Sequence, residues 1–252
     1  MTDKPIRVEI DGREPTLEEL YHPLLSNYGH FTAMQVRGGR VRGLDLHLRR
    51  LAAATGELFG TGLDPARVRE LLAHAIRGVP DASVRVNVYC PDELMTVVSV
   101  RPPHDSPAAP LRLRHVSYVR PAAHLKHVGG FGQVYFGRRA GAEGFDDALL
   151  CDHTGAVCEA AIANIGFFDG TVVTWPDSPN LPGIGMQLLA SRLPSRTARV
   201  MLADLPSYSA AFVTNSIGVA AVAGVDDVSF AVDAGLMRRI AEAEASIPWD
   251  EI

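Results

Sequence analysis

A lysine near the middle of the chain is the residue whose type best suits chemistry. Lys126 lies in the histidine- and glycine-containing segment 124–130. Lysine and arginine together number 24, and only Lys4 and Lys126 are lysines, which leaves 22 arginines. Arginine stays protonated, whereas a buried lysine can lose its proton and form a Schiff base. Lys126 is therefore a candidate nucleophile, and a chance surface lysine is the alternative.

A glutamate further along the chain has an apolar setting. Glu159 follows Val157 and Cys158, and apolar residues dominate 160–165. Burying a carboxylate there is unfavourable unless a cation or hydrogen-bond donors meet it. We therefore expect Glu159 to be buried with a partner, and a strand-end carboxylate that faces water is the alternative.

Three other stretches have donors that could bind an anion. Gly183 and Gly185 lie at the start of an expected apolar helix, where free backbone N–H groups attract negative charge. Residues 214–216 (Thr-Asn-Ser) offer hydroxyl and amide donors after an expected strand. Arg50 adjoins Arg49 on an expected helix. The alternatives are an ordinary glycine turn, a polar turn and a solvated surface pair.

Apolar periodicity predicts the elements that must position these residues. In the first half we expect helices over 17–25, 47–58 and 64–77, strands over 6–10, 30–36, 83–89 and 95–100, and a hairpin partner strand over 41–46. In the second half we expect helices over 133–143, from 183 onward and over 232–245, with strands over 111–119, 148–152, 157–159, 164–168, 171–175, 198–202, 211–214 and 219–222. Hairpins mixed with helices predict an α+β fold with mixed, mostly antiparallel sheets and flanking helices.

A proline-rich stretch suggests how the chain divides. Residues 101–110 hold four prolines and no periodic apolar pattern, which is typical of a linker. The sequence therefore predicts a smaller N-terminal α/β domain over 1–100, an interdomain linker over 101–110 and a larger C-terminal domain over 111–252.

Composition excludes several classes of protein. The hydrophobic content of 47% and charged content of 21% are those of a globular protein, and the net charge of −5 argues against nucleic-acid binding. Cys90, Cys151 and Cys158 lack close spacing of the zinc type, so we expect no metal site and a reducing cytoplasm. The first five residues lack the apolar run of a signal peptide, and no stretch approaches the roughly 20 apolar residues of a membrane span.

The candidate residues together suit one cofactor. Pyridoxal 5'-phosphate needs an amine for its aldehyde, a carboxylate for its ring nitrogen and donors for its phosphate. The sequence resembles the class IV aminotransferases of pyridoxal-phosphate fold type IV, which include branched-chain and D-amino-acid aminotransferases and aminodeoxychorismate lyases. The similarity extends from about Phe31 to Val222. Its motifs, in the family's order, are His47-x-x-Arg50-Leu51, Lys126, Glu159 through Asn164, and Leu181 through Gly185.

The resemblance implies a role for each motif. Lys126 would hold the cofactor as a Schiff base and then move the proton at the substrate α-carbon. Glu159 would pair with the pyridine nitrogen. The phosphate would be bound by Arg50, the backbone amides of Ile184 and Gly185, and then Asn215 and Ser216. Because family members are usually at least dimers, the resemblance also implies a homodimer.

The sequence departs from the family pattern at three places. Gly185 and Met186 stand where the family usually has Thr and Arg, so a hydroxyl contact to phosphate is lost. Thr32 replaces the Glu that many aminotransferases carry after the aromatic residue, and with 214–216 it is closer to the lyase branch. Residues 89–91 (Tyr-Cys-Pro) lie where lyases and D-amino-acid aminotransferases often place Arg.

No residue is therefore identified as the group that binds a substrate carboxylate. The candidates are His30, Tyr89 and His124, and each is equally consistent with a structural role.

Three functions follow from this reading. The first is a pyridoxal-phosphate aminotransferase that moves an amino group between a small amino acid or amine and a 2-oxo acid. The second is a 4-amino-4-deoxychorismate lyase, which eliminates pyruvate to give 4-aminobenzoate. The third is a catalytically silent binding protein on the same fold, and retention of both Lys126 and Glu159 argues against it.

Overall fold

The computed structural model describes residues 4–252, which form two compact units. Unit 1 takes the chain up to residue 104 together with 125–129 and 248–252, and unit 2 takes 105–124 and 130–247. Residues 1–3, which open both the predicted N-terminal domain and the segment expected to lack a signal peptide, lie outside the described part. The domain boundaries predicted from the proline-rich stretch stay a prediction.

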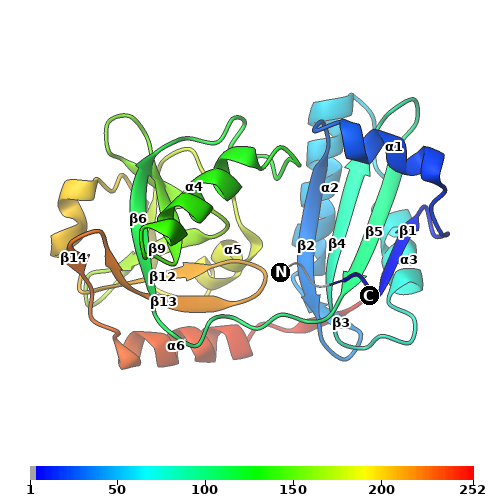
Figure 1. Ribbon diagram of the computed structural model, residues 1–252. Helices are drawn as coiled ribbons and strands as arrows, with labels where there is room; N and C mark the ends of the chain where they lie inside the picture. The colour runs from blue at the N-terminus through cyan, green and yellow to red at the C-terminus, as the bar shows by residue number, and fades with distance from the viewer. Residues whose placement is uncertain (1–3) are drawn as a thin grey trace. The chain divides into compact units, whose positions relative to one another are not determined.

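Unit 1 is an antiparallel sheet covered on one face by two helices (Figure 1). The strand order is β1 (Arg7–Ile10), β5 (Met95–Arg101), β4 (Ala82–Tyr89) and β2 (His30–Val36), and the helices are α2 (Leu44–Phe59) and α3 (Pro65–Ala75). Along β2 and β4 every second side chain, such as Met34 and Val86, is buried against those helices. The period of two therefore leaves one face of the sheet for other contacts.

The helix over 17–25 and the strand over 30–36 are confirmed with the predicted bounds, as α1 (Leu17–Leu25) and β2. A capping box formed by Thr16 and Glu19 starts α1. This helix buries none of its residues and exposes Leu17, Leu24 and Leu25.

The strand predicted over 41–46 is wrong. Strand β3 spans only Arg40–Arg42, and it pairs with β15 (Trp249–Glu251) from the end of the chain. Gly43 then adopts a left-handed conformation with φ of 69°, and α2 begins at Leu44. The N–H of Leu44 donates to the Asp250 carboxylate at 2.9 Å, so a partner some 200 residues away fixes this helix start.

Unit 2 is built on a mixed sheet that has nine strands among the described residues. The order is β11 (Ser195–Ala198), β10 (Val173–Pro176), β9 (Asn164–Phe168), β12 (Ala210–Thr214), β13 (Val219–Val225), β6 (Leu111–Ser117), β7 (Asp147–Cys151) and β8 (Val157–Ala160), with β14 (Val228–Ser229) beside β13. The pairs β10–β11, β13–β6 and β6–β7 are parallel and the rest are antiparallel.

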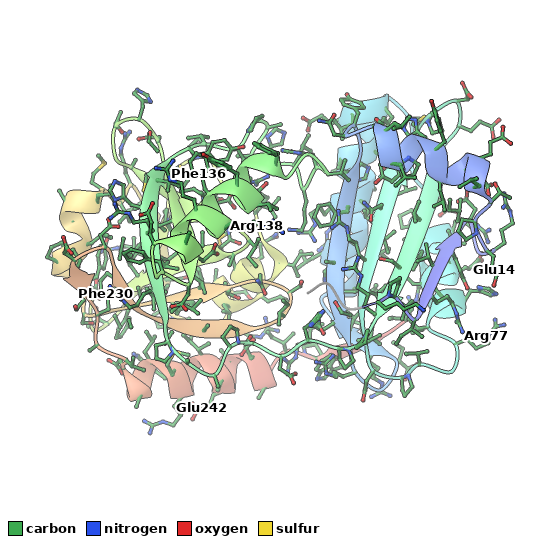
Figure 2. The ribbon with its side chains drawn as sticks, in the orientation of Figure 1. Glu14, Arg77, Phe136, Arg138, Phe230 and Glu242 are labelled. Atoms are coloured by element: carbon green, nitrogen blue, oxygen red, sulfur yellow. The ribbon has the colours of Figure 1, made fainter. Side chains whose placement is uncertain are left out.

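Three helices pack on this sheet: α4 (Phe131–Ala142), α5 (Ile184–Ala190) and α6 (Ala234–Ala245). Phe167 and Leu149 lie in one buried cluster of the unit, while Phe212 and Trp175 pack with α5 and α6 in another. Side chains fill the space between these layers (Figure 2). The α+β class with mostly antiparallel pairing is thus confirmed.

The strand predicted over 198–202 is wrong in its position. Strand β11 ends at Ala198, and a 3-10 helix follows over Leu202–Ser207. The Asp204 side chain accepts from the N–H of Met201 at 2.9 Å and so caps this turn. The apolar residues at 200–202 contribute to the core as a connection, which alternation alone does not separate from a strand.

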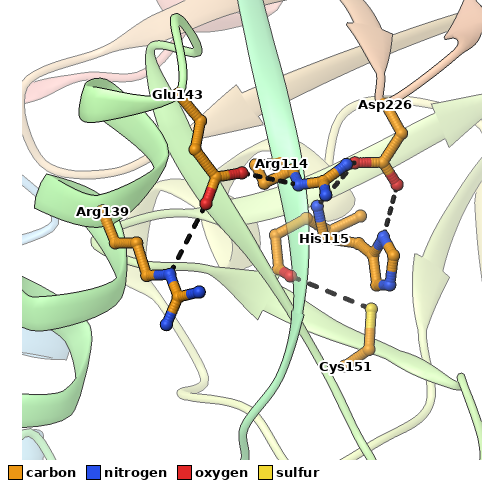
Figure 3. A network of polar contacts seen from close by, with 7 residues as sticks. Arg114, His115, Arg139, Glu143, Cys151 and Asp226 are labelled. Atoms are coloured by element: carbon orange, nitrogen blue, oxygen red, sulfur yellow. Dashed lines mark hydrogen bonds and ion pairs between the residues drawn. The ribbon is translucent and has the colours of Figure 1, made fainter.

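An acidic turn fixes the register of the central strand β6 (Figure 3). Asp226, whose φ is 49°, accepts hydrogen bonds from the Arg114 guanidinium, the backbone N–H of His115 and the His115 ring. Arg114 also pairs with Glu143 just beyond α4, at 3.1 Å. These contacts tie β6 to β13 and to α4, so the network is structural.

No helix within residues 4–252 is long and apolar enough to cross a membrane.

The close approach at Gly166 gives a test of the unit 2 core. A Cβ there would lie 2.7 Å from Phe212 and 3.1 Å from Trp175. We expect Gly166→Ala to lower the free energy of unfolding by roughly 1–3 kcal/mol, because it overpacks the core. Gly141→Ala on α4, where a Cβ meets nothing within 4 Å, should raise it by about 0.5–1 kcal/mol. Denaturant unfolding measures both, and equal effects would contradict this packing.

Candidate active site

Backbone pairing holds Lys126 beside strand β2 in unit 1. The N–H of Phe31 donates to the Lys126 carbonyl at 2.8 Å, and the N–H of Val128 donates to Gly29 at 2.9 Å. His30 and His127 form an antiparallel bridge, which sets Lys126 opposite Phe31. The Lys126 Nζ accordingly lies 4.9 Å from the centre of the Phe31 ring. Backbone pairing with β2 therefore fixes the position of Lys126.

A buried polar network surrounds Arg50 in the same unit. Thr32 Oγ1 accepts a hydrogen bond from Arg50 and lies 2.6 Å from His47 Nδ1. Burial, followed by the positive charges of Arg50 and Lys126, holds the pKa of His47 well below its usual value, so this ring is neutral. Burial lowers the pKa of Arg50 to about 10, which leaves it a cation at neutral pH. Its Nε is buried without a hydrogen-bond partner in the described chain.

His30 and Tyr89, two candidates for the substrate carboxylate, are both placed by packing in unit 1. His30 is buried and its Nε2 lies 2.9 Å from Thr55 Oγ1. Burial, and then the charge of Arg50, lowers the pKa of His30 to about 4. The Tyr89 ring packs against Gly29, and burial raises the pKa of its hydroxyl.

Glu159 is buried in unit 2 and paired, as its apolar neighbours predict. Its Oε1 accepts from Arg120 Nε at 2.6 Å, and its Oε2 accepts from the backbone N–H of Leu181 at 3.2 Å. The two side chains are 4% and 7% exposed, so the ion pair is shielded from water. Arg120 also donates to the Ala123 carbonyl. A carboxylate has about four acceptor positions, so these contacts leave room for a further donor.

The first turn of α5 packs directly on the turn at 214–216. A Cβ at Gly185 would lie 2.6 Å from Thr214 Oγ1 and 2.9 Å from the Asn215 carbonyl. The Asn215 Oδ1 accepts from the N–H of Ile217 at 2.8 Å and so closes its own turn. Gly185 therefore stands where the family usually has Thr because a side chain would collide with the neighbouring turn.

The predicted site residues thus fall into one group in each unit. Lys126 and Arg50 belong to unit 1, where both act electrostatically on His47. Unit 2 holds the rest, namely Glu159, Ile184, Gly185, Asn215 and Ser216. Glu159 contacts Leu181 just before the glycine turn, and Gly185 packs on Thr214 and Asn215.

Sequence reasoning missed Arg120, and it named Thr32 only as a departure from the family pattern, not as the partner of Arg50. A buried glutamate signals that some cation must meet it, but which of 22 arginines does so depends on the fold. Thr32 could have been found by its position two residues after His30 on the same strand face.

Comparison with known proteins identifies the family. The chain matches the description "Amino-transferase class IV" over residues 29–225, and it belongs to this family of pyridoxal-phosphate-dependent enzymes. No curated protein matches the sequence.

Solved structures show the same fold at low sequence identity. A putative 4-amino-4-deoxychorismate lyase of Legionella pneumophila has a TM-score of 0.82 and 19% identity, covering 92% of this chain and 95% of that one. A branched-chain aminotransferase of Thermoproteus uzoniensis with norvaline has a TM-score of 0.84 and 18% identity, covering 96% and 94%. A hypothetical aminotransferase of Mycobacterium tuberculosis, bound to α-ketoglutarate and PMP, has a TM-score of 0.84 and 18% identity, covering 95% and 98%. The resemblance to fold type IV is thereby confirmed.

The residues present fit the family's cofactor. Arg50 has a buried Nε without a partner in the described chain, which an anionic oxygen would satisfy. Gly185 lets the backbone approach closely where a Cβ would block it. Glu159 is a buried carboxylate with acceptor positions to spare. Phosphate, ring nitrogen and aldehyde therefore each have a group of suitable chemistry.

The depressed pKa of His30 predicts a stability that falls in acid. The folded-state pKa of about 4 lies below the ordinary value of 6.5, so the unfolded chain binds more protons between these values. Stability is complete above pH 6.5 and is lost as pH falls toward 4, by at most on the order of 3 kcal/mol from this residue. His47 acts in the same direction.

His30→Gln should remove part of this pH dependence, because glutamine does not titrate. The exposed His153→Gln is the matched control and should leave the slope unchanged. Urea unfolding at several values between pH 4 and 7 measures the slope. Equal slopes for wild type and His30→Gln would show that His30 is not buried in its neutral form.

Proposed function

We propose that this protein is a pyridoxal-phosphate-dependent aminotransferase that moves an amino group between a small amino acid or amine and a 2-oxo acid. The observation that carries the proposal is the joint retention of a strand-held amine, Lys126, and a buried ion-paired carboxylate, Glu159, in a chain of this family. A buried ion pair rarely adds net stability, so a mere scaffold has little use for it.

Each proposed residue has a task suited to its surroundings. When bound, pyridoxal phosphate supplies an aldehyde that takes up the substrate amine and a ring that accepts electrons. The Lys126 amine holds that aldehyde at rest and later carries the proton to and from the substrate α-carbon. The Glu159 carboxylate keeps a proton on the ring nitrogen, and the ion pair with Arg120 holds that carboxylate in place.

The phosphate would be bound by one cation and several neutral donors. Arg50 supplies the charge, oriented by Thr32. The backbone amides of Ile184 and Gly185, together with Asn215 and Ser216, supply the neutral donors.

A second candidate function is the 4-amino-4-deoxychorismate lyase. It is favoured by Thr32 in place of the glutamate of many aminotransferases, and by the Thr-Asn-Ser turn at 214–216. Both reactions use Lys126 as the base, so this residue does not separate them. Assays for 4-aminobenzoate release and for amination of 2-oxo acids, run on the same purified protein, do separate them.

We propose further that the enzyme acts as a homodimer in the cytoplasm. Helix α1 supports the dimer, since its exposed side chains include Leu17, Tyr21, Leu24 and Leu25. The free cysteines Cys90, Cys151 and Cys158 are consistent with a reducing compartment.

The role of Lys126 can be tested by trapping. Borohydride reduction should fix the mass of the cofactor on the peptide that contains Lys126, because only an amine bonded to the aldehyde is reduced in place. Lys126→Arg should lower turnover at least about 100-fold while the melting temperature changes little. Lys4→Arg, which alters the other lysine, should retain both trapping and turnover. Trapped mass on Lys4, or a working Lys126→Arg variant, would exclude the mechanism.

The role of Glu159 can be tested through the rate of proton abstraction. Glu159→Gln should retain the cofactor and slow α-proton exchange on the order of 100-fold, since an amide cannot hold the ring nitrogen protonated. Glu9→Gln is the matched control, because Glu9 is also buried but pairs with His74. It should lower stability and leave the exchange rate unchanged. Deuterium exchange at the substrate α-carbon measures the rate, and equal rates in both variants would remove Glu159 from this role.

A further inference from the structure

The face of the unit 1 sheet that lies away from α2 and α3 carries arginines and no acids on its strands, and Leu20 of α1 packs near Val97 on part of it. Because alternate side chains of β2, β4 and β5 pack on α2 and α3, the intervening ones lie on the opposite face. We call this the arginine face, and its members are Phe31, Ala33, Gln35, Ser83, Arg85, Asn87, Val97, Ser99 and Arg101. Any negative charge that meets these arginines must come from elsewhere.

Arg85 is held in a fixed position on this face. Its guanidinium carbon lies 3.5 Å from the centre of the Phe31 ring, and its Nε donates to Asn87 Oδ1 at 3.0 Å. Asn87 in turn donates to the Tyr89 hydroxyl at 3.3 Å. Within the described chain, the Arg85 side chain makes no other hydrogen bond and no ion pair. Stacking and one hydrogen bond therefore orient the fork and leave its two terminal amino groups available.

Arg101 adds a second charge beside the first. Ser83 pairs with Arg101 and Arg85 pairs with Ser99, so the two arginines are diagonal neighbours on one face. The Arg101 Nε is buried and finds no hydrogen-bond partner in residues 4–252. Burial lowers the pKa of Arg85, an effect that Tyr89 opposes and the charge of Arg101 increases. Two half-buried guanidinium groups without a carboxylate are unfavourable unless a ligand supplies one.

The proposed nucleophile lies near this pair. Lys126 Nζ and Arg85 Cζ approach the same Phe31 ring, at 4.9 Å and 3.5 Å from its centre. The two distances limit their separation to the sum, 8.4 Å. In an amino acid the amine nitrogen and the carboxyl carbon are two bonds apart, about 2.5 Å, and a charge-assisted hydrogen bond adds about 2.8 Å. This span of about 5.3 Å falls within the 8.4 Å limit, so the two distances are consistent with one small amino acid between the groups.

We propose that Arg85, with Arg101 beside it, binds the carboxylate of the substrate. The inference rests on the proposed function and sharpens it, because an amino or oxo acid uses this pair and a simple amine does not. The planar fork of arginine matches the two oxygens of a carboxylate. Arg50 serves a different anion, since it bonds to Thr32, whose side chain lies on the opposite, helix-covered face.

The test compares acids with their neutral esters on the cofactor-loaded enzyme. Calorimetric titration with pyruvate and 2-oxoglutarate, and with their methyl esters, measures the preference for a carboxylate. Wild type should bind at least one acid more tightly than its ester. Arg85→Gln should weaken binding of that acid about 10- to 100-fold and leave the ester unchanged, because it removes charged hydrogen bonds.

Two further variants guard against misfolding and unspecific charge effects. Arg101→Gln should produce a smaller loss in the same direction, and it tests the pair if Arg85→Gln proves unstable. Arg49→Gln, which changes an exposed arginine of α2, is the matched control and should change neither affinity. If no acid binds better than its ester, or if Arg85→Gln and Arg49→Gln behave alike, the proposal is wrong.

The remaining outcomes separate this inference from the function on which it rests. If inorganic phosphate loses as much affinity as the acid in Arg85→Gln, the pair is a general anion site and the carboxylate assignment is overturned. Borohydride trapping on Lys126 should persist in Arg85→Gln. Trapping without any preference for acids would overturn the inference alone. A preference for acids without trapping in wild type would overturn the proposed function and leave the arginine pair as a carboxylate site.

Discussion

The buried ion pair between Glu159 and Arg120 is the interaction on which unit 2 most depends. Two charges that are almost wholly removed from water repay their desolvation only with good geometry and further hydrogen bonds. Here Leu181 and Ala123 supply those bonds through their backbones. The pair therefore ties strand β8 to the segment that enters α5. The ion pair fixes the proposed ring-nitrogen carboxylate, and the second oxygen of that carboxylate holds Leu181, just before the proposed phosphate turn.

Unit 1 has the opposite electrostatic character. Its candidate groups are cations: Arg85 and Arg101 lie on a sheet face whose strands carry no carboxylate, and the Lys126 amine lies against the Phe31 ring. On the other face Arg50 is met by a neutral hydroxyl and a neutral imidazole. The low pKa of His47 matters here, because a protonated ring would add a repelling charge. Unit 1 therefore has cations on both faces of its sheet. Under the proposed function, the cofactor phosphate binds at Arg50 on the helix-covered face, and the substrate carboxylate binds on the arginine face.

Sequence patterns predicted the bounds of helices and strands where neighbouring residues alone determine those bounds. Alternation predicted the bounds of β2, a short apolar run predicted those of β9, and a strong N-terminal cap agrees with α1. The failures lie where distant contacts decide. Strand β3 is short because β15 pairs with it and Asp250 caps the following helix, and neither partner is near in sequence. The residues at 200–202 are apolar because the core needs them, although they form no regular strand.

The same division applies to the candidate site. The scarcity of lysine pointed to Lys126, and its neighbours predicted the burial of Glu159. The sequence analysis did not identify Arg85, because it alternates with valines as any half-exposed strand residue does. Arg85 is notable because no carboxylate lies among the neighbouring side chains of its sheet face. A sequence pattern does not show which side chains share a face across three strands. Sequence reasoning therefore finds a residue of unusual type more readily than a common residue in an unusual environment.

The two departures from the family pattern around the phosphate act in opposite directions under the proposed function. Gly185 leaves out a hydroxyl that would donate one neutral hydrogen bond, and the close turn at Thr214 and Asn215 leaves no room for it. Thr32 in place of glutamate removes a carboxylate that would compete for the Arg50 guanidinium. Charge-assisted hydrogen bonds are roughly twice as strong as neutral ones. Freeing the Arg50 charge therefore offsets the lost hydroxyl, and the phosphate relies more on the arginine than on the turn.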